Sequence, residues 1–315
     1  MSLEYCHPAE SDVEAVTDVL NRSRRELPLH LDQSVEEVEA QTFKNTDYNP
    51  NGFWLALRDS QIIGYGGALI EKSRIEAGFN DGWITIEVIP EYRGKGIEQE
   101  LMMRALNYLT LKEIGTAQRW CKGTKGWRHN LLLEFGFTAA HYEYVMVWKG
   151  ETPERYPLPG IIHLQHTLFR EATNEEVETF VEVFNDAFKE YYNFSPATVE
   201  RFIKSREIDR NIWRITFAKD GSRIVGVLKC CESVQYNKEN NTKIGWVDIL
   251  GVIKGYRRKG IGKALLSDGM AWIYDRGMDT IYLDLNAENR NALSLYTSLG
   301  FKIDREDTIY REKLE

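Results

Sequence analysis

A short basic and glycine-rich segment carries the clearest chemical signal in the sequence. It reads Lys254-Gly-Tyr-Arg-Arg-Lys-Gly-Ile-Gly262, follows a strand-like run that ends at Val252, and precedes a helical pattern from about Lys263. A helix N-terminus exposes unpaired N–H groups and partial positive charge, and glycines let the backbone approach a bulky anion. We therefore predict a pyrophosphate site, although the spacing is neither that of a Walker loop nor that of a dinucleotide fold.

A related segment occurs earlier in the chain. Residues 88–101 align with residues 252–265 at an offset of 164, with eight of fourteen positions identical. The same offset carries Gly136-Phe137 onto Gly300-Phe301 without a gap. A register held over this distance indicates two copies of one domain.

The repeat sets the predicted domain boundaries and elements. We expect domains at residues 1–150 and 165–315, joined by a linker at 151–164 that contains proline and glycine and lacks periodicity. The expected ranges are helices 12–26, 34–44 and 98–112 with strands 53–57, 62–70 and 83–88 in the first copy, and helices 174–190, 196–206, 263–276 and 290–299 with strands 213–218, 224–231, 246–252 and 280–286 in the second. One strand–loop–helix–strand unit must cross over in parallel, so we predict an α+β fold with a mostly antiparallel sheet.

The first helix of each copy carries a predicted start signal. Ser11 with Glu14, and Thr173 with Glu176, fit the capping-box pattern S/T-x-x-E. We expect both pairs to cap their helices.

Two signatures in the second copy together resemble the GNAT acetyltransferase superfamily. Arg257-Arg-Lys-Gly-Ile-Gly262 is similar to the family's R/Q-x-x-G-x-G/A acetyl-CoA loop, and Asn289 followed by Ala292-Leu-Ser-Leu-Tyr-Thr-Ser-Leu-Gly-Phe301 is similar to its second signature. The pairing of two such domains resembles the tandem members of the superfamily, mycothiol synthase among them. The resemblance implies two tandem GNAT-type domains, each a mixed, mostly antiparallel sheet flanked by helices with a splayed central strand pair, and acetyl-CoA as co-substrate.

The resemblance also implies a set of site residues, all in the second copy. Backbone near Leu250–Val252 would pair with the pantetheine arm and bind the developing oxyanion, and Gly251 fits a β-bulge. Tyr296 would be the general acid to the coenzyme A thiolate or, alternatively, a core tyrosine on an amphipathic helix. Asn289 would bind the pantetheine arm or, alternatively, cap the following helix. The predicted cofactor-binding residues are Leu250, Gly251, Val252, Arg257, Arg258, Lys259, Gly260, Ile261, Gly262, Lys263, Asn289 and Tyr296.

Two carboxylates are candidates for the general base, and the sequence does not decide between them. Asp284 lies between Leu283 and Leu285 and should point to the opposite face of its strand. Some family members have a carboxylate here that acts as base, so Asp284 is the predicted catalytic residue. Asp248 is a second candidate, and either side chain could instead be structural.

The first copy departs from this pattern at four positions that the resemblance assigns to cofactor binding or catalysis. Gly262 is replaced by Glu98, Asn289 by Lys125, Asp284 by Trp120 and Tyr296 by Leu132. We therefore predict that the first copy is degenerate and non-catalytic. Whether it binds coenzyme A loosely, walls off the substrate cleft or mimics a partner subunit stays open.

Composition excludes several classes of protein. The chain has 315 residues, a net charge of −8, four cysteines and no apolar run long enough to span a bilayer. These numbers argue against nucleic-acid binding, a disulfide framework and a membrane protein. The N-terminus lacks a signal-peptide pattern, and the six histidines have no ligand spacing for a metal. We expect a cytoplasmic protein, monomeric or homodimeric, without a metal.

The predicted function is transfer of an acetyl group from acetyl-CoA to a small-molecule or peptide amine by direct attack. The stretch Tyr191-Tyr-Asn-Phe-Ser195 should form part of the acceptor wall or else ordinary packing. The alternative is a non-catalytic, coenzyme A-binding regulatory or scaffold module.

Overall fold

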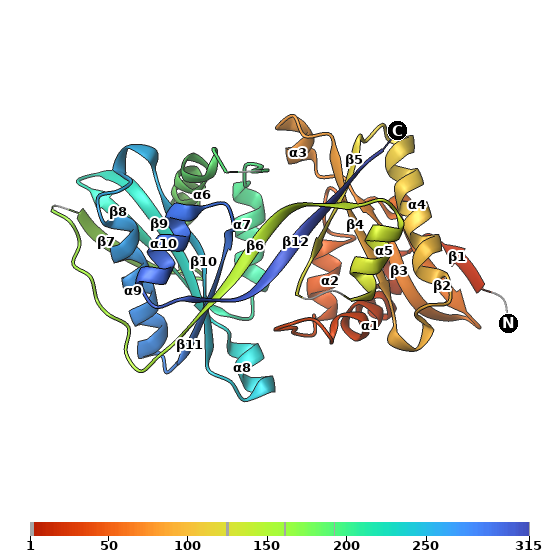
Figure 1. The fold of residues 1–315 in the computed structure, drawn as a ribbon, viewed down its shortest axis with the longest axis horizontal. Coiled ribbons are helices and arrows are strands. Elements are labelled where there is room, and N and C mark those ends of the chain that lie inside the picture. The colour runs from red at the N-terminus through yellow and green to blue at the C-terminus, as the bar shows by residue number, and fades with distance from the viewer. Residues whose placement is uncertain (1–2, 124–125, 161, 192, 315) are drawn as a thin grey trace. The chain divides into compact units, whose positions relative to one another are not determined.

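The computed structural model of the chain describes residues 3–123, 126–160, 162–191 and 193–314 (Figure 1). These residues form two compact units, Met1–Tyr142 with Glu306–Glu315, and Glu143–Arg305. The described residues between 150 and 160 form neither helix nor strand, whereas residues 162–164 already belong to a strand. The unit boundaries fall inside two long strands and not in the predicted linker. The assignment of separate roles to residues 1–150 and 165–315 stays a prediction.

The first unit is built on a mixed sheet with the strand order β1-β2-β3-β4-β5-β12. The elements of the first repeat are β1 (Leu3–Cys6), α1 (Val13–Arg24), α2 (Val35–Gln41), β2 (Phe53–Arg58), β3 (Gln61–Leu69), α3 (Lys72–Glu76), β4 (Asp81–Val88), α4 (Ile97–Leu111), β5 (Thr116–Cys121), α5 (Trp127–Glu134) and β6 (Thr138–Lys149). β4 and β5 are parallel, and the other paired strands of this unit are antiparallel. Helices α1 and α4 both contact β3 and β4.

The second unit repeats this design with the strand order β6-β11-β10-β9-β8-β7. The elements of the second repeat are β7 (Ile162–Leu168), α6 (Asn174–Phe188), α7 (Val199–Ile208), β8 (Ile212–Asp220), β9 (Arg223–Glu232), α8 (Val234–Asn240), β10 (Ile244–Val252), α9 (Ile261–Asp275), β11 (Thr280–Asn286), α10 (Arg290–Ser298) and β12 (Lys302–Lys313). β10 and β11 are parallel, and the other pairs are antiparallel. The predicted α+β fold, with one parallel pair in each mostly antiparallel sheet, is confirmed.

Each unit is completed by the last strand of the other sequence repeat. Residues 143–149 of β6 pair with β11, from Thr280 opposite Lys149 to Asn286 opposite Glu143. Residues 308–313 of β12 pair with β5 in the same way. The two repeats therefore exchange their terminal strands.

Two layers of side chains cover the sheet of the second unit. Successive residues of a strand point to opposite faces, so Val227 packs with Phe180 on the α6 side, while Leu228 packs with Leu265 on the α9 side. Helices α6 and α9 both contact β9 and β10 (Figure 1). This arrangement fixes the first turn of α9 beside the end of β10.

The predicted helix starts were right in one copy and wrong in the other. Thr173 Oγ1 accepts a hydrogen bond from Glu176 N at 3.1 Å, and Glu176 Oε2 accepts one from Thr173 N at 2.9 Å, which confirms this capping box. The Ser11–Glu14 box is wrong, because the Asp12 carboxylate accepts from Ala9 N at 2.8 Å and α1 begins only at Val13. Of the helices in the described ranges, none has the length and apolar character needed to cross a bilayer.

Candidate active site

The parallel strands β10 and β11 separate halfway along their length. Their pairing runs from Ile244 opposite Thr280 to Val247 opposite Leu283, but β10 continues to Val252. β9 stays paired with β10 over this last stretch. Backbone groups of β10 that point away from β9 therefore face an opening gap, and the predicted splay is confirmed.

A cleft of about 980 Å³ lies beside this gap, between α6, the end of β10, the first turn of α9 and α10. It is lined by Ala187, Phe188, Glu190, Tyr191, Leu250, Gly251, Val252, Arg257, Arg258, Gly260, Gly262, Lys263, Asn286, Glu288, Asn289, Asn291, Ala292, Leu295 and Tyr296. Of the twelve predicted cofactor-binding positions, all but Lys259 and Ile261 line this one cleft. The structure thus brings together residues that are up to 46 positions apart in the chain, from Leu250 to Tyr296.

Gly251 allows α6 to approach β10 closely. A Cβ atom at this position would lie 3.0 Å from Ala187 Cβ and 3.1 Å from Phe188 Cε2. The predicted β-bulge at Gly251 is wrong, since Gly251 pairs regularly with Val227 and the irregularity lies between Val247 and Ile249. The glycine is explained by the close approach of the helix instead.

The loop before α9 leads into the helix through residues in the left-handed conformation. Gly260 is the N-cap of α9 with φ 84°, and Gly262 lies in the first turn, because α9 begins at Ile261 and not at Lys263. Arg258 adopts φ 64°, a left-handed conformation that costs a non-glycine residue about 1 kcal/mol or more. Its Nη1 donates to Asn291 Oδ1 at 3.2 Å at the cleft. Arg258 thus lies at the cleft in a strained conformation, and its role in ligand binding stays a prediction.

Arg257 ties this loop to α6. Its Nε donates to Val252 O at 2.9 Å, its Nη2 donates to Ala187 O at 2.7 Å, and its Nη1 lies 3.4 Å from the Glu190 carboxylate. The guanidinium therefore holds the two walls of the cleft together, while its function in ligand binding stays a prediction.

Three further predicted residues are placed differently from one another. Lys259 lies with its Nζ 4.7 Å from the Tyr256 ring centre, outside the cleft lining. The Ile261 side chain is buried in the core, so only its backbone is suited to a ligand. Lys263 lines the cleft, and its Nζ lies 3.7 Å from the ring centre of Tyr156 in the inter-repeat segment.

Asn289 and Tyr296 enter the cleft from the two ends of α10. Asn289 Oδ1 accepts from Ala292 N at 3.0 Å, so the residue caps α10 and lines the cleft as well. Tyr296 is buried, with its ring 6.1 Å from that of Phe301. Burial, with a smaller contribution from Asp284, raises the pKa of Tyr296, which keeps the hydroxyl protonated.

Tyr191 also lines the cleft. Its hydroxyl oxygen accepts a hydrogen bond from Asn286 N at 2.6 Å, which ties the segment after α6 to the end of β11. Burial and then the charge of Glu143 raise the pKa of the Tyr191 hydroxyl. Its predicted neighbour in the acceptor wall, Tyr192, lies outside the described residues.

The two candidate bases differ in their surroundings. Asp284 is exposed between the buried Leu283 and Leu285, as the strand pattern predicts, and it does not line the cleft itself. Asp248 is bound to Lys229 at 3.0 Å, and Lys229 Nζ lies 3.7 Å from the Trp213 ring centre. Asp248 is thus engaged in an ion pair, and the assignment of the base to Asp284 stays a prediction.

Sequence reasoning missed part of the lining, namely Ala187, Phe188, Glu190, Asn286, Glu288, Asn291, Ala292 and Leu295. They come from the end of α6, the end of β11 and one face of α10. For α10 the sequence did contain a signal. Residues three or four positions apart lie on one face of a helix, so residues at that spacing after Asn289 share the face of Tyr296.

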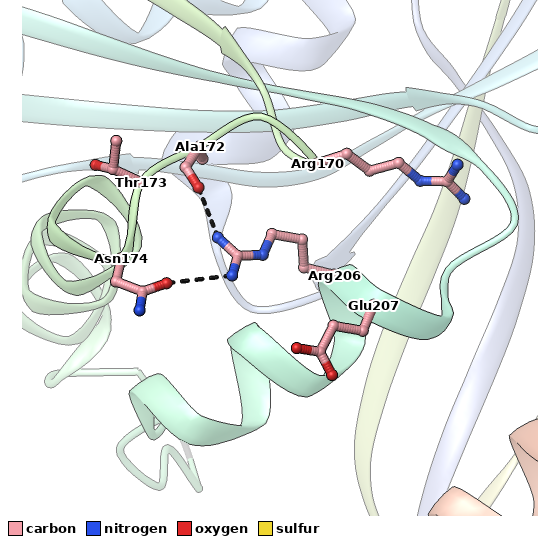
Figure 2. Close-up of a pocket in the computed structure, with 6 residues that line it drawn as sticks. All are labelled: Arg170, Ala172, Thr173, Asn174, Arg206 and Glu207. Carbon is pink, nitrogen blue, oxygen red and sulfur yellow. Dashed lines mark hydrogen bonds between the residues drawn. The ribbon is translucent and has the colours of Figure 1, made fainter.

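A second hollow, of about 550 Å³, lies at the start of α6 (Figure 2). Arg206 reaches across it and donates to Ala172 O at 2.6 Å and to Asn174 Oδ1 at 3.2 Å, which ties α7 to the α6 start. It contains no predicted site residue. Among the described residues no cluster of histidine, cysteine, aspartate or glutamate side chains is suited to a metal ion.

Comparison with known proteins decides the family. The model of the acetyltransferase (GNAT) family matches residues 14–137 and again residues 174–301. The chain belongs to the GNAT acetyltransferase family. As a GNAT protein it is an acyltransferase, and acetyltransferases of this family use acetyl-CoA.

Proteins similar to this GNAT protein include mycothiol acetyltransferases and a tandem GNAT protein. It is 23% identical over 323 residues to the mycothiol acetyltransferase of Catenulispora acidiphila, covering 96% of each chain, and 26% identical over 252 residues to that of Arthrobacter sp. (strain FB24), covering 76% of this chain and 72% of the relative. A tandem GNAT protein from the clavulanic acid biosynthesis pathway has the same fold, with a TM-score of 0.75 at 12% identity over 100% of this chain and 99% of the other. A GCN5-related N-acetyltransferase from Sphaerobacter thermophilus matches with a TM-score of 0.69 at 19% identity over 99% and 96%.

Proposed function

We propose that the second repeat transfers an acetyl group from acetyl-CoA to an amine by direct attack, with Tyr296 as general acid. The observation that carries this proposal is the cleft that joins the splayed end of β10, the N-terminus of α9 and the Tyr296 side chain. These parts have the chemistry that a thioester substrate with a diphosphate requires.

The residues that line the cleft support acetyl-CoA as the co-substrate. The first turn of α9 offers free N–H groups to the diphosphate, and Gly262 leaves space there, because a Cβ at this position would meet only Leu295 and Val252, at 3.6 and 3.8 Å. Arg258 and Lys263 supply positive charge at the same place. The unpaired edge of β10 beyond Val247 would hydrogen-bond the amides of the pantetheine arm.

The chemistry asks for three contributions from the chain. A backbone N–H near Leu250–Val252 would stabilise the oxyanion, a contribution of roughly 3–4 kcal/mol in other enzymes. The Tyr296 hydroxyl, kept protonated by burial, would donate its proton toward the leaving thiolate. Asp284 would accept the proton of the attacking ammonium, directly or through water.

The acceptor is a small-molecule or peptide amine. Tyr191 and Asn286, which line the cleft and are hydrogen-bonded to each other, would form the wall against which it binds. The net charge of −8 favours a cationic acceptor only weakly.

Release of free thiol tests the proposal. Acetyl-CoA is incubated with the chain and a panel of small amines, amino acids and peptides, and thiol is measured over time. We expect acceptor-dependent release with at least one amine, abolished in Gly262→Glu. Tight acetyl-CoA binding without turnover on any amine would favour the coenzyme A-binding module instead.

A further inference from the structure

The anion loop of the first repeat matches that of the second in residue-level detail. Arg93 Nε donates to Val88 O at 2.9 Å, its Nη2 donates to Ser23 O at 2.9 Å, and its Nη1 contacts Glu26 at 2.9 Å. Each partner lies 164 positions before the corresponding partner of Arg257. The loop before α4 is therefore the counterpart, in the first repeat, of the proposed diphosphate seat.

A carboxylate of the protein already sits in that seat. Glu98 stands where the second repeat has Gly262, and its Oε1 accepts a hydrogen bond from Gly94 N at 2.9 Å. The Glu98 side chain is 4% exposed, and its Oε2 is buried without a hydrogen-bond partner among the described residues. A second anion would meet this charge at close range, where repulsion is weakly screened.

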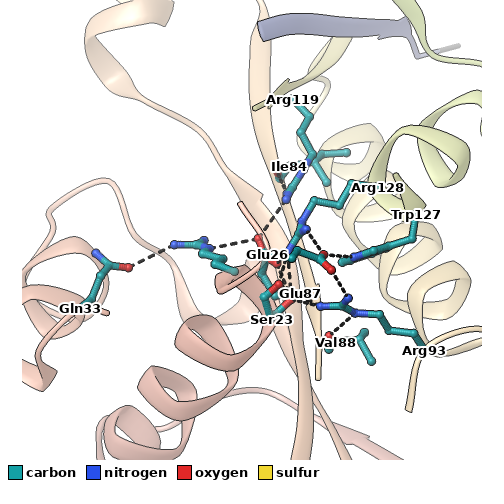
Figure 3. A network of polar contacts seen from close by, with 11 residues as sticks. Ser23, Glu26, Gln33, Ile84, Glu87, Val88, Arg93, Arg119, Trp127 and Arg128 are labelled. Atoms are coloured by element: carbon teal, nitrogen blue, oxygen red, sulfur yellow. Dashed lines mark hydrogen bonds and ion pairs between the residues drawn. The ribbon is translucent and has the colours of Figure 1, made fainter. Parts of the chain in front are cut away.

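Polar side chains of the first repeat gather around a buried carboxylate at the place where the second repeat has its cleft (Figure 3). Glu87, 1% exposed, stands where the second repeat has Gly251. Its carboxylate accepts hydrogen bonds from Ser23 Oγ at 2.7 Å, Arg128 Nη2 at 2.6 Å, Arg119 Nη2 at 3.0 Å and Arg24 Nε at 3.2 Å. We call Glu87 and these four residues the Glu87 cluster. In the second repeat the counterparts of Ser23, Arg24 and Arg128 are Ala187, Phe188 and Ala292, which line the open cleft.

The splayed strand edge of the first repeat is occupied too. β4 and β5 pair only from Asp81 to Trp83, so β4 has free backbone groups beyond that point. Arg119 reaches into this gap and donates from Nη1 to Ile84 O at 2.9 Å. Leu132, in place of the catalytic tyrosine, is fully buried in the core, and Lys125 lies outside the described residues.

We infer that the first repeat is a sealed copy: Glu98 permanently occupies its diphosphate seat, the Glu87 cluster fills its pantetheine channel, and the chain binds a single acyl-CoA, in the second repeat. The stoichiometry rests on the proposed function of the second repeat, whereas the sealing of the first does not.

Calorimetric titration with acetyl-CoA tests this inference on the full chain and on Gly262→Glu, which gives the second repeat the residue that seals the first. We expect one site per chain, weakened by about a hundredfold or more in the variant through repulsion of the diphosphate. Two sites in the unchanged chain, or full binding retained in Gly262→Glu, would overturn the inference. A chain that binds no acetyl-CoA would refute the proposed function while agreeing with a sealed first repeat.

Hydrogen–deuterium exchange of the unchanged chain gives the same answer without a variant. Acetyl-CoA should slow exchange in residues 250–265 and leave residues 86–101 as they were. Protection of residues 86–101 by acetyl-CoA would contradict the sealed site.

As a matched variant for the calorimetric titration, Glu98→Gly should still show one site, because the Glu87 cluster continues to fill the channel.

Discussion

The exchange of terminal strands can be tested at one pair of equivalent positions. Met146 in β6 and Tyr310 in β12 are related by the repeat offset of 164, yet they lie in different units. Met146, 1% exposed, stands opposite Leu283 in the core of the second unit. Tyr310, 6% exposed, stands opposite Arg119 in the core of the first. Truncation of each side chain should therefore destabilise the unit that does not contain the rest of its own repeat.

The size of the effect follows from burial. Replacing a buried methionine by alanine costs about 2–5 kcal/mol, and replacing a buried aromatic residue costs about 3–5 kcal/mol. Tyr310→Ala also loses the 2.5 Å hydrogen bond between the Tyr310 hydroxyl and His129 Nδ1. A loss of about 2 kcal/mol would accelerate exchange of amides that open with the whole unit by roughly thirtyfold.

Hydrogen–deuterium exchange by peptide reads out both variants, and each serves as the control of the other. Met146→Ala should accelerate exchange in β11 and leave β5 unchanged. Tyr310→Ala should accelerate exchange in β5 and leave β11 unchanged. The opposite pattern, with each substitution acting inside its own repeat, would refute the exchanged strands.

Three further predictions concern single side chains. Tyr296→Phe should lower turnover by at most about 10²–10⁴-fold with little change in the KM for acetyl-CoA, and unchanged thiol release would remove Tyr296 from the mechanism. Because burial raises the pKa of Tyr296, the unchanged enzyme should lose no activity from tyrosine ionisation up to pH 9. Asp284→Asn should lower kcat and shift its pH profile, while Asp248→Asn should not, and equal profiles for both would argue against Asp284 as base. Glu87→Gln should destabilise the first unit by about 3–5 kcal/mol in urea unfolding at pH 7, because it leaves buried arginines without their carboxylate. Burial alone would raise the pKa of Glu87, but Arg24, Arg128 and Arg119 together lower it. The ionised Glu87 therefore contributes fully to the free energy of unfolding above about pH 4.3, and this contribution is lost as the pH falls. If the difference in that free energy between Glu87→Gln and the unchanged chain grew on acidification, this reasoning would be contradicted.

Local signals in the sequence predicted most of the second repeat. The basic loop, the capping box at Thr173 and the Asn289–Phe301 signature depend on residues close together in the chain, and the structure places them as expected. The start of α9 was missed by two residues, because Gly260 in a left-handed conformation already acts as N-cap.

Long-range pairing could not be predicted in the same way. β6 and β12 occupy equivalent positions in the repeat, and the strands with which they pair are set by contacts far apart in the chain, so the repeat alone does not decide which sheet each one joins. The sequence predicted only part of the blocked site in the first repeat. Glu98 was recognised, whereas the Glu87 cluster draws on positions from Ser23 to Arg128 that only the fold brings together.

A crystal structure of the chain grown with acetyl-CoA tests the central claim most directly. The account predicts electron density for the coenzyme along the second repeat, with the diphosphate on the N–H groups at Gly260–Lys263 and the thioester near Tyr296. Density bound instead at Arg93 and the loop before α4, with the cleft of the second repeat empty, would contradict it.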